Sequence, residues 1–248
     1  MKNCLEVRHV GKKYGEQRIL RDITFSLSEG EVLGIIGPNG AGKTTLFNII
    51  AGWVSPSQGE VFWRGKNITR RSPDRLCREG LASTFQIPQV FREMSVLENV
   101  LMGAWFGQGS PPGESQAWEK AHNLLEMVGL MEKKNTPARE LTLMQQRLLE
   151  LARALATEPQ LLLLDEIAAG LSLKAVNQLT ELILQLRDQG LTLLLTDHLL
   201  NLVVPVSDRL LALDQGEIIA EGPPQALMHD PRVEAAYLGT GEAAGEEG

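Results

Sequence analysis

Alternating apolar and polar positions near the start of the chain predict two antiparallel strands. The alternation covers residues 4–10 and 18–27, as in strands that turn one face toward solvent. Runs made up almost entirely of apolar residues predict a second kind of strand, one that is covered on both faces. These runs are Val32–Ile36, Leu161–Leu164 and Leu191–Leu195. The pattern therefore predicts a small antiparallel sheet beside a buried, mixed core sheet.

Apolar residues at helical spacing dominate the middle of the chain. This pattern predicts that the stretch from Ser95 to about Ala156 is mostly helical. An exposed loop is expected to interrupt it at residues 107–113, which are rich in glycine and proline. The block is therefore expected to be a helical subdomain inserted into an α/β core. Other expected elements are helices at 46–52, 73–80 and 174–189, a strand at 81–85, and a closing hairpin of 208–213 with 217–220.

Composition and charge narrow the classes of protein to consider. The chain of 248 residues has a formal charge of −7, which argues against a nucleic-acid-binding protein held by phosphate contacts. Its two cysteines, Cys4 and Cys77, lack the spacing of a metal site and suit a reducing cytosolic compartment. No apolar run approaches the length of a membrane span. A role at a membrane is therefore expected from the cytosolic face, through partner proteins.

A glycine-rich loop after the first buried strand carries the main chemical signal. It reads Gly37-Pro38-Asn39-Gly40-Ala41-Gly42-Lys43-Thr44-Thr45. The strand Val32–Ile36 precedes it and the helix expected at 46–52 follows, which is the context that a phosphate-binding loop requires. Inward-turned N–H groups and the helix N-terminus bind phosphate. Lys43 is expected to reach the β- and γ-phosphates, Thr44 to bind Mg²⁺, and Thr45 to reach the α-phosphate. The chain is thus predicted to bind a nucleoside triphosphate.

Carboxylates follow the second buried strand, at the sheet edge where α/β proteins bind ligands. Asp165 is placed to share Mg²⁺ with the hydroxyl of the phosphate loop, and Glu166 to orient or deprotonate an attacking water. His198 follows the next buried strand and can contact a γ-phosphate, although an isolated histidine there is more often structural. Tyr14, in a turn expected at 11–16, can stack on adenine or simply pack.

Taken in order, these features resemble the nucleotide-binding subunit of an ABC transporter, from Leu5 to Leu238. The features are Tyr14, the phosphate loop, Gln86, Asp165-Glu166 and His198. Residues 91–100, 168–171 and 230–239 are similar to the ATP-binding subunits of branched-chain amino-acid importers. The resemblance implies an ABC ATPase fold: a P-loop NTPase core with a mixed sheet, an antiparallel β subdomain and an inserted helical subdomain. It implies an ATPase that powers a membrane importer, with other amino acids, urea or amides equally compatible as solutes.

The resemblance also implies a role for each matching residue. Tyr14 becomes the residue that stacks on adenine, and Gln86 senses Mg²⁺ and the γ-phosphate. Glu166 becomes the catalytic base and His198 the switch histidine. With Lys43, the last three make up the expected catalytic set, and ATP and Mg²⁺ are the expected ligands.

Partners and location follow from the same resemblance. Two ATP molecules are expected to lie between two ABC ATPase subunits arranged head to tail, either identical or different. The surface around Gln86 to Glu93 is expected to receive integral membrane permease subunits, and no nucleic acid is expected. The protein would lie on the cytoplasmic side of the cell (inner) membrane, attached peripherally.

The chain departs from the family pattern at the signature loop, and also at Ile167, Ser172-Leu173 and Leu199, where the family usually has proline, Asn-Pro and aspartate. The family's signature loop, Leu-Ser-x-Gly-Gln, caps the γ-phosphate on the opposite subunit, and here it reads Leu141-Thr142-Leu143-Met144-Gln145. Thr142 keeps a hydroxyl, whereas Met144 replaces a glycine. We expect its side chain to crowd the facing phosphate and to strain the backbone angle.

This departure keeps two alternatives open beside a working transport ATPase. The first is a turnover-impaired partner in an asymmetric heterodimer, in which another subunit supplies an intact signature. The second is an ABC ATPase outside transport, acting in DNA repair or on ribosomes, although such proteins usually carry two cassettes or long inserts.

The chain divides into four parts on these grounds. Residues 1–86 are expected to form the first part of the nucleotide-binding core with the antiparallel β subdomain. Residues 87–156 form the helical subdomain with the signature loop, and 157–238 the second part of the core. Residues 239–248 are small and acidic, and we expect them to be disordered.

Overall fold

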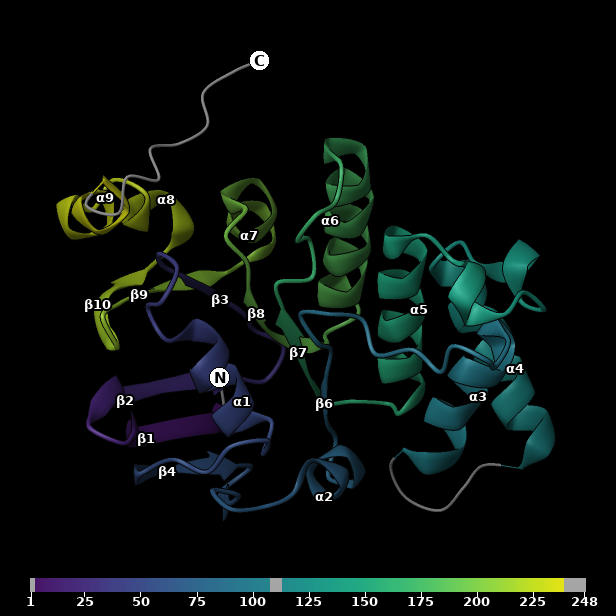
Figure 1. Cartoon of the computed structure of the whole chain (residues 1–248), viewed down its shortest axis with the longest axis horizontal. Helices are drawn as coiled ribbons and strands as arrows, with labels where there is room; N and C mark the ends of the chain where they lie inside the picture. Colours follow the sequence, from purple (N-terminus) through teal and green to yellow (C-terminus); the bar gives the residue numbers. More distant parts are fainter. Residues whose placement is uncertain (1–2, 108–112, 239–248) are drawn as a thin grey trace.

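The computed structural model describes residues 3–107 and 113–238, which form two sheets with helices around them (Figure 1). The antiparallel sheet contains, in spatial order, β2 (Gln17–Ser28), β1 (Asn3–Tyr14), β4 (Gln58–Trp63) and β5 (Lys66–Asn67). The core sheet contains β10 (Glu217–Gly222), β9 (Arg209–Asp214), β3 (Val32–Ile36), β8 (Thr192–Thr196), β7 (Leu161–Asp165) and β6 (Leu81–Ser83). Only β10 among these core strands runs antiparallel to its neighbour. The sheet is therefore mixed, as predicted.

The core sheet is buried on both faces, and this explains its runs of leucine. In β7, Leu161 and Leu163 face the antiparallel sheet and α1 (Lys43–Ile50). Leu162 and Leu164 face the opposite cluster, which includes α6 (Leu173–Asp188) and α7 (Leu200–Val206). Because successive residues of a strand alternate between faces, a strand covered on both sides needs apolar residues throughout.

The first hairpin is longer than the alternation of its residues indicated. Residues 11–14 were expected in a turn, but β1 continues to Tyr14, which pairs with Gln17. Register shifts interrupt the pairing between Val7 and Lys13. Each bulge reverses the inward and outward sides of the strand, so the alternation breaks although the strand continues.

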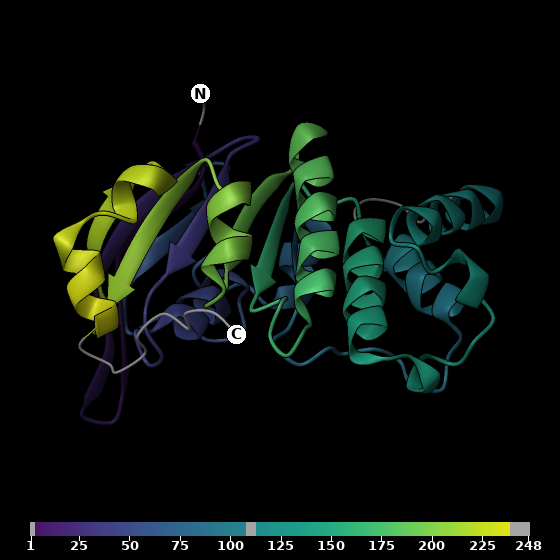
Figure 2. The same ribbon diagram turned by 90° about the horizontal axis from the view of Figure 1, so that it is seen from above.

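Helices between the two halves of the core gather at one end of the molecule (Figures 1 and 2), and we call them the helical body; their buried residues share one apolar cluster with the core sheet. They are α3 (Val96–Phe106), α4 (Glu114–Met127) and α5 (Leu143–Ala156), with short 3-10 turns at Met131–Lys133 and Ala138–Glu140. Before them, α2 (Pro73–Arg78) leads into β6. The helical block expected from the sequence is therefore present, while its boundaries at 86 and 156 stay a prediction.

Three short helices near the C-terminus were not anticipated. They are α7, α8 (Pro224–Leu227) and α9 (Pro231–Leu238), and the last two lie at the end opposite the helical body (Figure 2). Helices of four to eight residues are too short to give a clear helical period. The tail expected at 239–248 lies outside the described residues. No helix within those residues is both long and apolar enough to cross a membrane.

Candidate nucleotide site

The glycine-rich loop lies between β3 and α1, at the carboxyl edge of the core sheet. Its backbone is specified by glycine, since φ is +82° at Gly40 and +107° at Gly42. A Cβ at Gly42 would also lie 2.7 Å from Leu20 Cδ2 in β2. The loop therefore adopts a turn that only glycine allows, closely packed against the antiparallel sheet.

Lys43 is held along this loop and is not extended into solvent. Its side chain is only 5% exposed, and Nζ donates hydrogen bonds to the carbonyl oxygens of Gly37 at 2.6 Å and Pro38 at 3.1 Å. A buried ammonium beside inward-turned N–H groups forms a concentrated positive field. The arrangement suits a polyphosphate, which carries several negative charges on closely spaced oxygens.

A cavity of about 260 Å³ opens beside the loop and joins three residues that lie far apart in the sequence. Thr44, Gln86 and Asp165 line it, and these are the three predicted magnesium ligands. Asp165 is 6% exposed, and its Oδ1 has no hydrogen-bond partner among the described atoms. Carboxylate, hydroxyl and amide oxygens match the hard oxygen donors that Mg²⁺ prefers. When no metal is bound, a buried carboxylate that serves as a metal ligand has an oxygen without a hydrogen-bond partner.

The electrostatics of Asp165 lead to a prediction for the metal-free protein. Burial, reinforced by Glu166, raises the pKa of Asp165 to about 7, although Lys43 opposes the rise. The Asp165 carboxyl thus binds its proton more tightly in the folded chain than in the unfolded chain. The free energy of unfolding therefore falls as pH rises from about 4 toward 7. Asp165→Asn should remove this loss and raise the free energy of unfolding at pH 8 by about 1 kcal/mol or more.

The measurement is urea unfolding in EDTA at pH 5 and pH 8, with Asp188→Asn, an exposed carboxylate on α6, as the matched control. The pH dependence of unfolding should be smaller for Asp165→Asn than for the unmodified chain. An unchanged difference between the two pH values would contradict the prediction.

Glu166 and Gln86 meet at this edge of the sheet. Gln86 Nε2 donates a hydrogen bond to Glu166 Oε2 at 2.5 Å. The Glu166 backbone has φ of +46°, and its N–H donates to Thr196 O at 2.8 Å. A non-glycine residue in this left-handed region is uncommon, and such geometry concentrates at functional sites. Glu166 is thus fixed at the backbone and held at its carboxylate by Gln86.

Asp197 organises the loops around Glu166. It is fully buried, and its carboxylate accepts hydrogen bonds from the N–H groups of Ala168 at 2.9 Å and Leu199 at 3.1 Å. His198 Nδ1 lies 3.5 Å from Asp197 Oδ1, while the imidazole stays about half exposed. Burial raises the pKa of Asp197, and those two N–H groups oppose the rise. The predicted histidine therefore emerges at the same edge as Glu166.

Tyr14 lies apart from this cluster, at the tip of the β1–β2 hairpin. It is 52% exposed, and Lys12 Nζ lies 4.7 Å from the centroid of its ring. The ring is accessible to a flat partner, as stacking on adenine requires. Its role stays a prediction.

The segment 141–145 begins α5 and is arranged as a helix cap. Thr142 Oγ1 accepts from Gln145 N–H, and Gln145 Oε1 accepts from Thr142 N–H at 3.0 Å. Met144 lies in the first turn and has no positive φ, so the expected backbone strain is absent because the helix fixes ordinary angles there. The half-buried side chain of Met144 packs against the larger apolar cluster.

A contact between the phosphate loop and the C-terminal helix was not predicted from the sequence. The Tyr237 hydroxyl, on α9, accepts a hydrogen bond from Gly37 N–H at 2.9 Å. Gly37 is buried at the start of the phosphate loop, and a buried N–H requires a partner. The C-terminal helix therefore helps to fix the loop, across two hundred residues of sequence.

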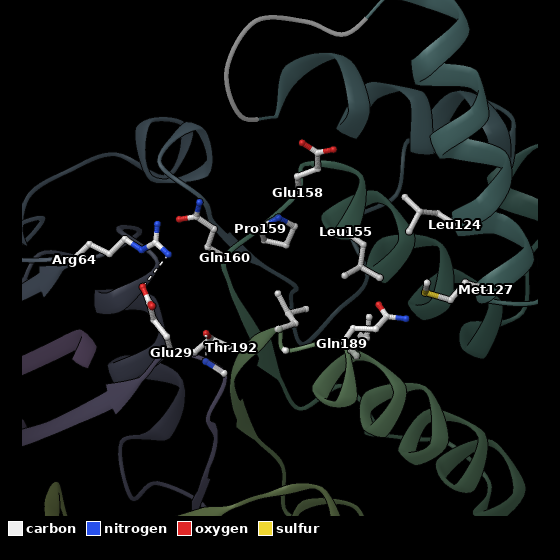
Figure 3. Close-up of a pocket in the computed structure, with 14 residues that line it drawn as sticks. Glu29, Arg64, Leu124, Met127, Leu155, Glu158, Pro159, Gln160, Gln189 and Thr192 are labelled. Atoms are coloured by element: carbon white, nitrogen blue, oxygen red, sulfur yellow. Dashed lines mark hydrogen bonds and ion pairs between the residues drawn. The ribbon is translucent and has the colours of Figure 1, made fainter. Parts of the chain in front are cut away.

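A larger cavity of about 490 Å³ lies elsewhere (Figure 3). Apolar side chains line one side, and the ion pair of Glu29 with Arg64, at 2.9 Å, lies on the other. The apolar residues include Leu124, Met127 and Leu155. Gln160 precedes β7 and Thr192 begins β8, so this cavity lies at the amino ends of the strands. The phosphate loop and Asp165 are at the carboxyl ends, where α/β sheets bind ligands.

Together, the phosphate loop, the buried aspartate and the oriented glutamate define a P-loop nucleoside triphosphatase. The sequence profile of the ABC transporter family matches residues 20–169. A second profile, described as a branched-chain amino acid ATP-binding cassette transporter, matches residues 217–243.

Curated relatives resemble the chain over nearly its whole length. The high-affinity branched-chain amino acid transport ATP-binding protein LivG of Salmonella typhimurium is 37% identical, over 95% of this chain and 97% of its own. The probable LivG of Methanocaldococcus jannaschii is 35% identical, with the same coverages. The chain belongs to the ABC transporter family as an ATP-binding protein, an ATPase that binds and hydrolyses ATP.

Solved structures agree with this assignment. An ATP-binding cassette of an ABC transporter in its ADP conformation is 35% identical, covers 96% of this chain and 100% of its own, and has a TM-score of 0.87. A dimeric cassette in a post-hydrolysis state, bound to ADP and Pi, is 27% identical, covers 89% and 98%, and has a TM-score of 0.80. The predicted fold class and family are confirmed, and neither alternative function is favoured by these relatives.

Proposed function

We propose that this chain powers the import of branched-chain amino acids across a membrane by ATP hydrolysis. The observation that carries the proposal is the 35–37% identity over 95% of the chain to LivG proteins. The match of residues 217–243 to the C-terminal profile of the same transporters supports it. The protein would act at the cytoplasmic side of the cell membrane, attached to membrane-embedded permease subunits.

In this proposal the chain holds ATP by its phosphates. Backbone N–H groups of the loop 37–45, other than that of Gly37, cradle the phosphate oxygens, Lys43 pairs with the β- and γ-phosphates, and Thr45 reaches the α-phosphate. Thr44, Gln86 and Asp165 would hold Mg²⁺, which when bound neutralises charge on the β- and γ-phosphates. Tyr14 stacks on the adenine ring from the hairpin tip. The shared cavity and the unpaired Oδ1 of Asp165 support the metal assignment.

Glu166 is assigned as the general base. Its carboxylate orients the attacking water and accepts a proton from it, while Gln86 holds the carboxylate by the hydrogen bond of 2.5 Å. His198, which Asp197 orients, contacts the γ-phosphate and links its loss to movement of the loop after β8. Mutual geometry supports these roles, since all of these residues come from the carboxyl ends of β7 and β8 or from the segment after β6.

A second ATPase subunit would complete the site. In a head-to-tail pair, residues 141–145 of one subunit face the nucleotide on the phosphate loop of the other. The dimeric neighbour bound to ADP and Pi supports such a pair. Whether two identical subunits form a working pair depends on whether Met144 is accommodated beside the facing nucleotide.

The permease is proposed to bind an apolar groove next to the predicted contact region at 86–93. The groove measures about 460 Å³ and lies between α2 and the helical body. Aromatic and sulfur-containing side chains line it, and Phe91 and Phe106 are 45% and 67% exposed. The aromatic and sulfur-containing side chains that line the groove are those of Trp53, Cys77, Phe85, Phe91, Met102 and Phe106. Exposed apolar surface of this kind is typical of a protein–protein interface.

Solute uptake by whole cells tests the proposal. Deleting the gene in its host should abolish high-affinity uptake of radiolabelled leucine, isoleucine and valine, and the unmodified gene, but not Lys43→Ala, should restore it. Parallel uptake of urea, acetamide and glutamate separates the alternative solutes. Unchanged leucine uptake together with loss of another of these solutes would overturn the assignment of branched-chain amino acids.

A further inference from the structure

The segment that carries Gln86 is held in place mainly by side chains of α5. We call residues 85–91 the strap, because they cross from β6 toward α3 without forming a helix or strand. Gln86 projects from the strap to Glu166. A segment without its own ladder of hydrogen bonds takes its position from the side chains that bind its backbone.

Glu150 makes the central contacts to the strap. It is only 3% exposed, and its two carboxylate oxygens accept hydrogen bonds on both sides of Gln86. Oε1 accepts from Gln89 N–H at 2.8 Å and Oε2 from Phe85 N–H at 3.3 Å. Burial raises the pKa of Glu150, and these two N–H groups and the nearby arginines oppose the rise. One buried carboxylate thus fixes the backbone before and after the glutamine.

Two arginines of the same helix add to the attachment, and Asn99 of α3 holds the far end of the strap, accepting from Phe91 N–H at 2.8 Å and donating to Phe91 O at 3.0 Å. Arg147 Nη2 donates to Gln86 O at 3.0 Å and to Ala169 O at 3.1 Å, which joins the strap to the loop after Glu166. Arg153 donates to Gln89 O, and its guanidinium carbon lies 5.0 Å from the centroid of the Phe91 ring. Since α5 begins at the signature segment, one rigid helix connects that segment, Gln86 and the Glu166 loop.

The strap also forms a wall between the two cavities. Phe85, Gln86 and Gln89 line the nucleotide cavity, whereas Phe85 and Phe91 line the apolar groove together with Glu150 and Arg153. The Glu150 carboxylate and the Arg153 guanidinium, which hold the strap, therefore lie on its groove side, and Gln86 lies on its nucleotide side.

We propose that Glu150 is a positioning residue that sets Gln86 against Glu166. The effect on turnover rests on the proposed function, in which Gln86 and Glu166 act on the nucleotide. The positioning does not, since the isolated chain already contains every contact. Helices are rigid, so a shift of the Glu150 carboxylate moves both strap N–H groups together.

Glu150→Gln tests the positioning role in the purified full-length chain. The substitution keeps the size of the side chain but presents an NH₂ group to one of the two N–H donors, which disrupts that contact. We expect kcat for ATP hydrolysis to fall about 10- to 100-fold, with KM for ATP changed by less than about twofold. Glu181→Gln, an exposed glutamate on α6, is the matched control and should leave both constants unchanged.

A double-mutant cycle with Gln86→Ala separates positioning from general destabilisation. If Glu150 acts through Gln86, adding Glu150→Gln to Gln86→Ala should cause little further loss of kcat. Should Glu150→Gln fail to fold, as judged by circular dichroism, Glu150→Asp takes its place in the same cycle. An unchanged kcat in the single variant, or losses that multiply fully in the double variant, would overturn the inference. Both outcomes are independent of whether leucine is the transported solute.

Discussion

Glu166→Gln should lower the rate of ATP hydrolysis by about 10²- to 10⁴-fold, the range expected for loss of a general base. Glutamine keeps the shape of the side chain and can still bond to Gln86, so the loop around it should persist. An amide cannot accept a proton from water at neutral pH, which removes the chemical step alone. Nucleotide affinity should therefore change little or rise, because bound ATP is no longer turned over.

Phosphate release and binding of a fluorescent ATP analogue, measured on the same preparations, separate the two effects. Glu181→Gln serves again as the exposed control, and Lys43→Ala as the variant expected to lose affinity as well as turnover. Turnover within about threefold of the unmodified chain would move the base to another residue, with His198 the first to test.

The parts of this site that could be predicted from sequence are contiguous in the chain. A glycine loop between an apolar strand and a helix, and Asp165 after four leucines, carry their own local context. The helical block was predictable for the same reason, since its apolar period extends over several turns. Local pattern thus predicted the phosphate loop, the carboxylates and an α/β core with an inserted helical block, while the family resemblance supplied Gln86 and the ABC ATPase fold.

The missed features depend on residues that meet only in the folded chain. Glu150 binds the N–H groups of Gln89 and Phe85, which lie 61 and 65 residues before it in the sequence. Tyr237 binds Gly37 from a short helix near the other end of the chain. Within α5, Glu150 has the appearance of one polar residue in an amphipathic helix. Nothing local indicates that this side chain points inward, because its partners are backbone N–H groups, which every sequence contains.

The start of α5 shows both the use and the limit of a family pattern. Comparison with the family pattern marked Met144 as an unusual residue and suggested backbone strain, which the helical conformation of Met144 excludes. The remaining effect is chemical. First-turn N–H groups of a helix lack intrahelical partners and favour an anion, and the capping box already uses those of Thr142 and Gln145. The N–H groups of Leu143 and Met144 remain for a facing phosphate, with the Met144 side chain beside them.

Met144→Gly should therefore raise ATP turnover of a pair made of two copies of this chain by at least about tenfold. The methionine side chain would keep a facing phosphate from approaching these N–H groups, and the loss of one donor to a transition-state oxyanion costs about 10²- to 10³-fold. The gain should come with a loss of stability of about 1–2 kcal/mol, because glycine weakens the helix and the half-buried side chain no longer packs. Phosphate release at saturating ATP measures the first effect, and urea unfolding the second.

Met144→Ala and Leu143→Gly are the matched controls for this result. The first removes most of the side chain without loosening the backbone, and should give a smaller gain in turnover. The second loosens the same turn at a residue that is 43% exposed and should give none. Measurable turnover in the unmodified chain that is unchanged in a folded Met144→Gly would mean that the methionine is accommodated and that two copies already form a working pair. A gain confined to Met144→Gly and Met144→Ala would instead indicate that the native chain works beside a second subunit whose signature keeps its glycine, because the ATP on this phosphate loop then faces an unobstructed helix start.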